Sequence, residues 1–311
     1  MSVVIEANNL QKYYNNFQAV AGVDFQVKRS MCFGILGPNG AGKTTTVGMI
    51  YCFTPISGGE LNVLDMDVTH HPREIKSRLG VVPQENNLDQ ELTVWENLLV
   101  YANYYGIKRA NAKEKAKELL NFFGLSEKAH HQVEQISGGM KRRLTIARGL
   151  IHTPEILILD EPTTGLDPQS RRLIWEHLRQ LKNRGLTLIL TTHYLEEASH
   201  LCDDLIIMDD GIILEEGKPY NLIQKHVGEK IVEIDAEEAK INTVLEEIAP
   251  LSSGYQLAGQ TIFLYIRKDE NPAVNKLNSF DYVNEYRVRP SNLEDVFLKL
   301  TGKGLSYGEF D

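Results

Sequence analysis

The stretch "CFGILGPNGAGKTTT", residues 32–46, decides how this chain folds. Its first five residues are a compact apolar run, which is typical of a strand buried in a parallel sheet. The turn that follows fits the pattern G-x-x-x-x-G-K-[ST] from Gly37 to Thr44, and a helix is expected from about Gly42. A strand, a glycine-rich turn and a helix in this order predict a phosphate-binding loop in a doubly wound α/β fold.

The residue types of this loop suit the binding of phosphate groups. Glycines let the backbone curl so that successive N–H groups converge on one anion, and the helix N-terminus adds about half a positive charge. Lys43 is expected to reach the β- and γ-phosphates of a nucleotide, while the hydroxyl of Thr44 ligates Mg²⁺.

Two adjacent carboxylates end a second apolar run, "ILILDEP" at residues 156–162. Asp160 is placed to hold Mg²⁺ or its water, and Glu161 could accept a proton from an attacking water. His193 follows the run "LILTT", and Gln84 follows "GVVP". We expect His193 to donate to a γ-phosphate and Gln84 to contact Mg²⁺ or the water.

A second turn, "QISGGMKRRLTI" at residues 135–146, also has the makings of an anion site. It places a hydroxyl, two glycines and a basic run at the expected start of a helix, where bare backbone N–H groups can hold an anion. Topology alone would let this turn face the chain's own phosphate loop, because helices that precede parallel strands begin at the phosphate-binding edge. The basic residues 141–143 are expected to add a positive field behind the turn.

The composition limits the classes of function. Hydrophobic residues make up 42% of the 311 residues and charged residues 24%, as in an ordinary soluble globular protein. A net charge of −9 argues against a nucleic-acid surface, which normally needs a basic face. No uncharged apolar run approaches the roughly 20 residues that span a bilayer, so a membrane role is expected through a partner. Three well-separated cysteines are expected to be reduced core residues of a cytosolic protein.

The texture along the chain predicts a large domain at 1–227 and a small α+β domain at 228–311. The first 30 residues alternate as antiparallel strands do, and residues from about 84 to 135 read as helical, with a capping box at Thr93 and Glu96. Beyond 228, strands are predicted at "EKIVEID", "TIFLYIRK" and "YVNEYRV", with helices at about 237–249 and 292–301. Ser291 and Glu294 are expected to form the capping box of the last helix.

The motifs "GPNGAGKTT", "VVPQ", "ISGGM", "ILILDEP", "GLDP" and "TTH", in this order, resemble those of ATP-binding-cassette (ABC) transporter ATPase subunits over residues 3 to about 220. The resemblance implies a P-loop NTPase cassette with a parallel core sheet, an antiparallel β subdomain and a helical subdomain at about 84–140. It also implies ATP and Mg²⁺ as cofactors.

The resemblance assigns roles residue by residue. The ATP-binding Walker A loop comprises Gly37, Pro38, Asn39, Gly40, Ala41, Gly42, Lys43, Thr44 and Thr45. The other nucleotide-binding positions are Tyr14, Ser137, Gly138, Gly139 and Asp167. Gln84, Glu161 and His193 are the catalytic positions, and Thr44, Gln84 and Asp160 are the Mg²⁺ positions. Tyr14 would stack on adenine, with the neighbouring Tyr13 as the alternative.

The sequence departs from the family at Met140, where the commonest signature, LSGGQ, has glutamine. Function is expected to survive, because the anion contacts need only the hydroxyl and the backbone N–H groups. The "GGMKRR" version and the tail "PSNLEDVFLKLTG" resemble exporters of the drug-resistance (daunorubicin) and nodulation-factor type. That subgroup pairs with a separate membrane subunit of the type-2 ABC export class.

The resemblance therefore implies a cytosolic ATPase, peripheral on the inner face of the cell membrane, that works as a head-to-tail homodimer with ATP shared between the copies. Neither nucleic-acid binding nor direct membrane insertion is expected. The catalytic motifs leave two alternatives open, an importer subunit and a soluble ABC ATPase without a transport role. The helix near Tyr101 and Tyr104 is expected to dock on the membrane subunit.

Overall fold

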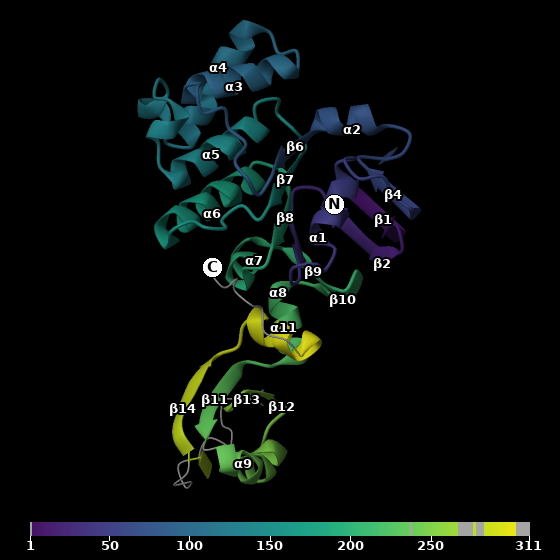
Figure 1. Cartoon of the computed structure of the whole chain (residues 1–311), viewed down its shortest axis with the longest axis vertical. Coiled ribbons are helices and arrows are strands. Elements are labelled where there is room, and N and C mark those ends of the chain that lie inside the picture. The colour runs from purple at the N-terminus through teal and green to yellow at the C-terminus, as the bar shows by residue number, and fades with distance from the viewer. Residues whose placement is uncertain (1, 237, 267–275, 278–282, 303–311) are drawn as a thin grey trace. The chain divides into compact units, whose positions relative to one another are not determined.

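The chain divides into two compact units, Met1–Glu215 and Glu216–Asp311, each with its own hydrophobic core. The computed structural model describes residues 2–236, 238–266, 276–277 and 283–302 (Figure 1). The first unit contains an antiparallel sheet, a mainly parallel sheet and a group of helices. The second contains an antiparallel sheet with helices.

The antiparallel sheet of the first unit has the strand order β2-β1-β4-β5. Its strands are β1 (Val3–Tyr14), β2 (Phe17–Lys28), β4 (Gly58–Val63) and β5 (Met66–Asp67). Alternate residues of β1 and β2 are buried, as the sequence pattern predicted, and they pack against apolar residues of the helix that follows the phosphate loop. Antiparallel strands in this segment are therefore confirmed, and β1 and β2 are each 12 residues long.

The second sheet has the order β10-β9-β3-β8-β7-β6. Its strands are β3 (Cys32–Leu36), β6 (Leu79–Val82), β7 (Ile156–Asp160), β8 (Thr187–Thr192), β9 (Asp204–Asp209) and β10 (Ile212–Gly217). The strand β3 pairs in parallel with both β8 and β9, and β7 pairs in parallel with β6 and β8. Every residue of β3 is buried, which explains its unbroken apolar sequence.

The path of the chain puts helices on both faces of this sheet. The connection from β3 to β6 crosses the sheet in one direction, whereas those from β6 to β7, β8 and β9 run in the other. Because such crossovers are right-handed, the helices of the two groups cover opposite faces. The direction changes between β3 and β8, and ligands of α/β sheets bind at the carboxyl ends of the strands at such a point.

The helices of the first unit follow the sheet in chain order. They are α1 (Lys43–Ile50), α2 (Pro72–Arg78), α3 (Val94–Tyr104), α4 (Arg109–Phe122), α5 (Gly138–Gly149), α6 (Pro168–Asn183) and α7 (Leu195–Leu201). Thr93 and Glu96 form the expected capping box of α3, and Gly124, with a φ of 63°, follows the end of α4. The helical segment is thus confirmed, and its last helix, α5, continues to residue 149 to reach the sheet.

The second unit is an antiparallel sheet in the order β12-β13-β11-β14. Its elements are α8 (Pro219–His226), β11 (Lys230–Ala236), α9 (Ile241–Ile248), β12 (Tyr255–Ala258), β13 (Thr261–Ile266), β14 (Val283–Pro290) and α11 (Leu293–Thr301). The apolar face of α9 packs on one side of the sheet. Because α8 packs against α11, the unit begins at Glu216, earlier than the boundary at 228 that the sequence texture suggested.

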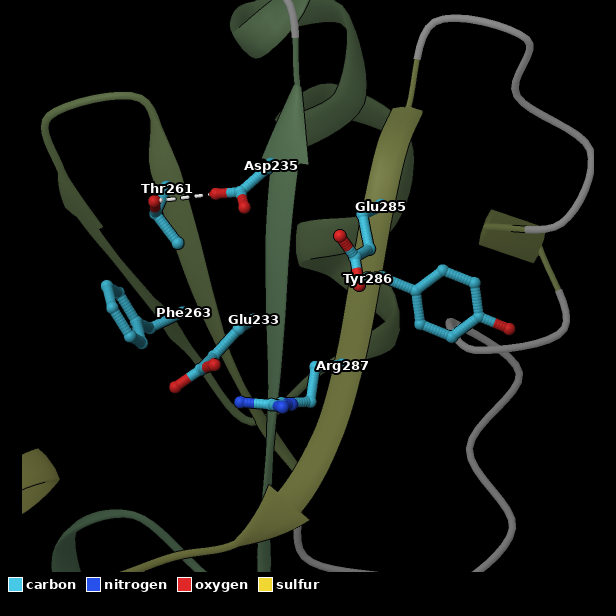
Figure 2. A pocket seen from close by; sticks show the side chains of 7 residues that line it. All are labelled: Glu233, Asp235, Thr261, Phe263, Glu285, Tyr286 and Arg287. Atoms are coloured by element: carbon cyan, nitrogen blue, oxygen red, sulfur yellow. Dashed lines mark hydrogen bonds between the residues drawn. The ribbon is translucent and has the colours of Figure 1, made fainter.

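The other side of this sheet carries polar side chains. Figure 2 shows Glu233, Asp235, Thr261, Phe263, Glu285 and Arg287 along a shallow hollow, with Tyr286 directed to the opposite side, where it packs on the core. The Thr261 hydroxyl donates to the carboxylate of Asp235 at 2.7 Å. None of the residues singled out by the sequence motifs lies on this face.

The start of α11 corrects one expectation. Asn292, rather than Ser291, caps the helix, and Asp295 completes the capping box in place of Glu294. The hydroxyl of Ser291 instead donates to the carbonyl of Gly228. The cap lies one residue later because the side chain of Asp295 is also held by Arg289, at 2.7 and 2.8 Å.

Candidate nucleotide-binding site

The phosphate loop joins the end of β3 to the start of α1 at the point where the chain direction across the sheet changes. Gly40 and Gly42 have φ values of 86° and 98°, in the left-handed region that favours glycine. A Cβ atom on Gly42 would also lie 2.5 Å from the carbonyl oxygen of Ala19. Both the backbone conformation and the packing therefore require glycine at residue 42.

Lys43 begins α1 and lies within the loop, with only 5% of its surface exposed. Its ammonium donates to the carbonyls of Gly37 and Pro38 at 2.8 and 2.9 Å. Burial lowers the pKa of Lys43, whereas the negative charges of Glu161 and Asp160 act to raise it. The ammonium is thus held in the glycine loop, within electrostatic range of both predicted carboxylates.

Thr44 and Thr45 follow Lys43 in the first turn of α1. The side chain of Thr44 is exposed and that of Thr45 is half-buried, so Thr44 is accessible to a ligand bound at the loop. Thr46 lies in the interior, where its hydroxyl donates to the carbonyl of Gly42 at 2.9 Å. The hydroxyl of Thr44 is therefore accessible to a ligand, whereas that of Thr46 is used in a hydrogen bond to the backbone at the start of α1.

Asp160 ends β7, next to Thr191 on the neighbouring strand β8. The hydroxyl of Thr191 donates to the carboxylate of Asp160. Burial raises the pKa of Asp160, while this hydrogen bond acts to lower it. Sequence reasoning missed Thr191; its only signal was its position two residues before His193, near the end of an apolar strand.

Gln84, Glu161 and His193, each from the end of a different strand, meet at one point. The side-chain amide of Gln84 donates to Glu161 Oε2 at 3.2 Å, and His193 Nδ1 lies 3.1 Å from Glu161 Oε1. The imidazole of His193 is the largest influence that lowers the pKa of Glu161. The carboxylate is therefore ionised at neutral pH, as a proton acceptor must be.

The backbone of Glu161 has an unusual conformation that orients its side chain. Its φ is 44°, a left-handed value that a non-glycine residue seldom adopts. The N–H of Glu161 donates to the carbonyl of Thr191 at 3.1 Å, which holds this residue against β8. Asp160 and Glu161 thus point in different directions although they are adjacent in sequence.

The second turn begins α5. Ser137 caps the helix, accepting from the N–H of Met140 at 3.3 Å. The two glycines differ: a Cβ atom on Gly139 would lie 2.4 Å from the hydroxyl of Ser170 on α6, whereas one on Gly138 would meet nothing within 4 Å. Ser137 and Gly138 are exposed, so this turn is open on its outer side.

Asp167 and Tyr14 are also exposed. Asp167 caps α6 and accepts from the N–H of Ser170 at 2.9 Å, so it belongs to the same patch as Gly139. Tyr14 ends β1, with the ammonium of Lys12 4.9 Å from the centre of its ring. Tyr13 is exposed to a similar extent, 43% against 47%, and both aromatic rings remain available.

Arg142 is the most prominent polar residue that sequence reasoning misjudged. It was expected to contribute only a positive field, but it is 3% exposed and donates to backbone carbonyls on both sides of the site. A buried arginine on the helix of a glycine turn has no local pattern that distinguishes it from a solvated one. Its bonding depends on the sheet order.

The fold and the loop define a P-loop nucleotide-binding protein with helices on both faces of a mainly parallel sheet. The family profile described as "ABC transporter" matches residues 20–164, and that of "Nodulation factor export protein NodI, C-terminal domain" matches residues 242–302. The chain is 44% identical to a Nod factor export ATP-binding protein I of Ralstonia nicotianae over 96% of this chain and 94% of that protein. The corresponding protein of Burkholderia thailandensis is 44% identical over 97% of this chain and 99% of its own length.

Solved structures of ATP-binding cassettes have a fold similar to that of this chain. The ADP conformation of an ABC-transporter ATP-binding cassette has a TM-score of 0.66 and 28% identity, and covers 73% of this chain and 95% of that one. A dimeric cassette in a post-hydrolysis state with ADP and Pi has a TM-score of 0.63 and 27% identity, and covers 69% and 98%. The chain belongs to the ATP-binding proteins of ABC transporters, and it is an ATPase of that type. None of the helices within the described parts of the chain is long and apolar enough to cross a membrane.

Proposed function

We propose that two copies of this chain pack head to tail around shared ATP and power export through a separate membrane subunit. The observation that carries the proposal is the contrast between the two turns. The phosphate loop already encloses its lysine, whereas Ser137 and Gly138 lie exposed. A Cβ atom on Gly138 would meet no other described part of the chain within 4 Å. A second copy could bring that open turn to the nucleotide, as two-fold symmetry would make both sites alike.

Within each site, residues 37–45 bind the phosphates of ATP, and Mg²⁺ is held by Thr44, Asp160 and Gln84. The donor set fits this ion, because Mg²⁺ prefers oxygen ligands and is usually bound by one or two carboxylates, substrate phosphates and water. Asp160 supplies the carboxylate, and its hydrogen bond from Thr191 leaves a second oxygen free of that contact. Bound Mg²⁺ would neutralise charge on the phosphates.

Glu161 acts as the general base on the attacking water, and His193 donates to the γ-phosphate. Their mutual distance of 3.1 Å, with Gln84 on the other oxygen, supports the assignment. Asp167 and the signature residues 137–139 contact the ATP of the other copy, and Tyr14 stacks on adenine. Hydrolysis would remove the nucleotide contacts that join the copies, which opens the dimer and moves the membrane subunit.

The proposal that this chain powers export, rather than import, rests on its similarity to named proteins. The similar proteins from Ralstonia and Burkholderia are named as export ATP-binding proteins, and the second unit matches the C-terminal domain of a nodulation factor export protein. We therefore place this chain at the cytoplasmic face of the cell membrane, attached through an integral membrane subunit. A six-span membrane protein encoded by an adjacent gene would favour this assignment; a periplasmic binding protein there would favour import.

The contact with the membrane subunit is proposed at the end of α3. Tyr104 is 75% exposed and makes an edge-to-face contact with Tyr101, which is itself held under Arg148 at 4.1 Å. Charged residues at both tyrosines should weaken co-purification of the membrane subunit, while Tyr220→Asp on α8 is an exposed aromatic control. Unchanged co-purification of the tyrosine variant would remove this helix from the interface.

The shared site is tested by complementation between two inactive variants. Lys43→Ala removes the lysine of the phosphate loop, and Ser137→Arg blocks the signature turn. Each homodimer should be nearly inactive, but a mixed dimer contains one site built from both intact parts and should regain part of the ATP hydrolysis. The variants are co-expressed with the membrane subunit under different tags and purified through both tags.

Activity of the mixed dimer no higher than that of either variant alone would count against the shared site. If hydrolysis required two working sites, ATP would still close the one intact site. ATP-dependent crosslinking across that site is therefore measured in the same sample, and its absence would overturn the head-to-tail arrangement.

A further inference from the structure

Arg142 lies on the inner side of α5, about one turn after the signature turn formed by residues 137–139. A guanidinium has five N–H donors in one plane. Among the described residues, Arg142 directs them at five backbone carbonyls. They are those of Pro162 (2.6 Å), Pro83 (2.6 Å), Gln84 (3.1 Å), Asp160 (3.0 Å) and Glu161 (3.2 Å). The side chain therefore joins two segments of chain, 83–84 and 160–162.

Those two segments carry the side chains that meet at the site. Gln84 donates to Glu161 from one segment to the other, and Asp160 lies beside them. Arg142 thus holds the backbone beneath three predicted site residues without touching the phosphate loop. The loop belongs to β3 and α1, whereas the hydrogen bonds of Arg142 within the described residues go to segments 83–84 and 160–162.

The charge of Arg142 is balanced by dipoles. Within the described part of the chain it has no carboxylate at ion-pair distance, so the five carbonyl oxygens face the cation directly. Burial lowers its pKa to about 10, while Glu197 and Asp160 act to raise it, and the side chain stays charged at neutral pH. Only arginine has enough donors in one plane for this arrangement; a lysine ammonium has three and no planar fork.

The same face of α5 continues the attachment. Thr145 and Arg148 follow Arg142 at intervals of three residues, which keeps them on one side of the helix. The Thr145 hydroxyl lies 2.9 Å from the carbonyl of Lys141 in its own helix and 3.2 Å from Asn86 Oδ1. Arg148 donates to the carbonyls of Asn86 and Asn87 at 3.2 and 2.5 Å. The segment from Pro83 to Asn87, which carries Gln84, is therefore attached to α5 at several points.

We propose that Arg142 is a positioning residue for ATP hydrolysis, which fixes the segments carrying Gln84, Asp160 and Glu161 to the helix that Ser137 caps. The proposal rests on the roles given above to these residues. Because five hydrogen bonds join α5 to these segments, a displacement of the signature turn should carry the hydrolytic groups of the same chain with it. A misplacement of about 1 Å can cost about 100-fold in rate, so loss of the attachment should act on catalysis more than on nucleotide binding.

The test compares Arg142→Lys with Arg143→Met in the complex with the membrane subunit. Arg143 is the matched control, because it is the next residue of α5 and its hydrogen bond goes to the carbonyl of Phe123, at the end of α4. Arg142→Lys should lower kcat by about 100-fold and change KM for ATP by less than about threefold. Arg143→Met should leave kcat within about threefold of the wild type.

Two further readouts separate positioning from general destabilisation. Amide hydrogen exchange at residues 84–88 should be faster in Arg142→Lys than in wild type and unchanged in Arg143→Met. In a Glu161→Gln background, Arg142→Lys should cause little additional loss, because residues that act through one another are not additive. If Arg142→Lys does not fold, Thr145→Val takes its place. It removes only the hydroxyl near Asn86 Oδ1 and the Lys141 carbonyl, and should give a smaller loss of kcat.

Wild-type kcat in Arg142→Lys, or an equal loss in Arg143→Met, would overturn the proposal. A loss that adds in full to that of Glu161→Gln would leave Gln84 and Asp160 as the groups that Arg142 positions, whereas unchanged amide exchange at residues 84–88 would overturn the proposal. A wild-type rate in Glu161→Gln alone has a different meaning: it would remove the proposed role of Glu161 and leave the attachment of the Gln84 segment to be judged by the exchange data.

Discussion

The two helix N-termini that could hold an anion, at α1 and at α5, are built differently. At α1 the turn needs glycines with a left-handed backbone, and a Cβ atom at residue 42 would collide with Ala19. The ammonium of Lys43 lies inside this turn and donates to its backbone. At α5 the turn is satisfied by its own serine cap, and Gly138 has open space around it. Similar glycine-rich sequences can therefore form a turn that encloses its own lysine in one place and an open, self-capped turn in another.

The largest effect is expected from the carboxylate beside the first turn. Glu161→Gln keeps the shape of the side chain but cannot take a proton, so kcat should fall by about 10²–10⁴-fold, with ATP binding retained. Steady-state hydrolysis and nucleotide binding are measured in the complex with the membrane subunit. A rate near that of the wild type would show that Glu161 is not the general base.

Replacing one glycine in each turn compares the backbones directly. Gly42→Ala combines an unfavourable φ with a Cβ contact at 2.5 Å, and should cost about 2–4 kcal/mol of stability. Gly138→Ala should change stability by less than about 0.5 kcal/mol and instead lower hydrolysis in the dimer. Thermal unfolding of the isolated chain measures the first difference. Equal losses of stability in Gly42→Ala and Gly138→Ala would contradict the inference that the folded chain requires glycine at residue 42 but not at residue 138.

The second turn also contains a glycine that the chain itself requires. Gly139→Ala places a Cβ 2.4 Å from the Ser170 hydroxyl and 2.9 Å from its Cβ, and should cost about 1–3 kcal/mol. Adding Ser170→Gly should recover much of this loss, because both close contacts disappear. Denaturant unfolding of the single and double variants measures the recovery; no recovery would mean that another contact requires Gly139.

The smallest effect concerns pH. The pKa of Glu161 is lowered mainly by His193, so its carboxylate stays ionised as the pH falls through the ordinary range of glutamate. His193→Ala removes this influence, the pKa of Glu161 rises, and the acid limb of the kcat–pH profile should move to higher pH. His200→Ala, an exposed histidine near Glu196, is the control and should not move it. If the acid limb of the kcat–pH profile did not move in His193→Ala, the ionisation of Glu161 during catalysis would not depend on His193.

Local patterns were sufficient for much of the fold. The apolar runs predicted β3, β7 and β8 because a strand buried on both faces has no polar positions. The capping box at Thr93 was found correctly, because its hydrogen bonds join residues three apart. At Ser291 the same pattern failed by one residue, since a longer-range partner, Arg289, holds Asp295. The short strand β12 was not predicted.

The sequence by itself determined the phosphate loop, because its parts are neighbours in the chain: a strand, a glycine-rich turn and a lysine at fixed spacing. Only the tertiary structure decided which side chains meet. Gln84 and Glu161 are 77 residues apart, and the bonds of Arg142 reach residues from 18 to 59 positions away. Such contacts depend on the order in which strands join the sheet, which no short-range periodicity encodes. For the same physical reason, the structure alone distinguished Gly139, packed against a neighbouring helix, from Gly138, where an added Cβ would meet no other described segment within 4 Å.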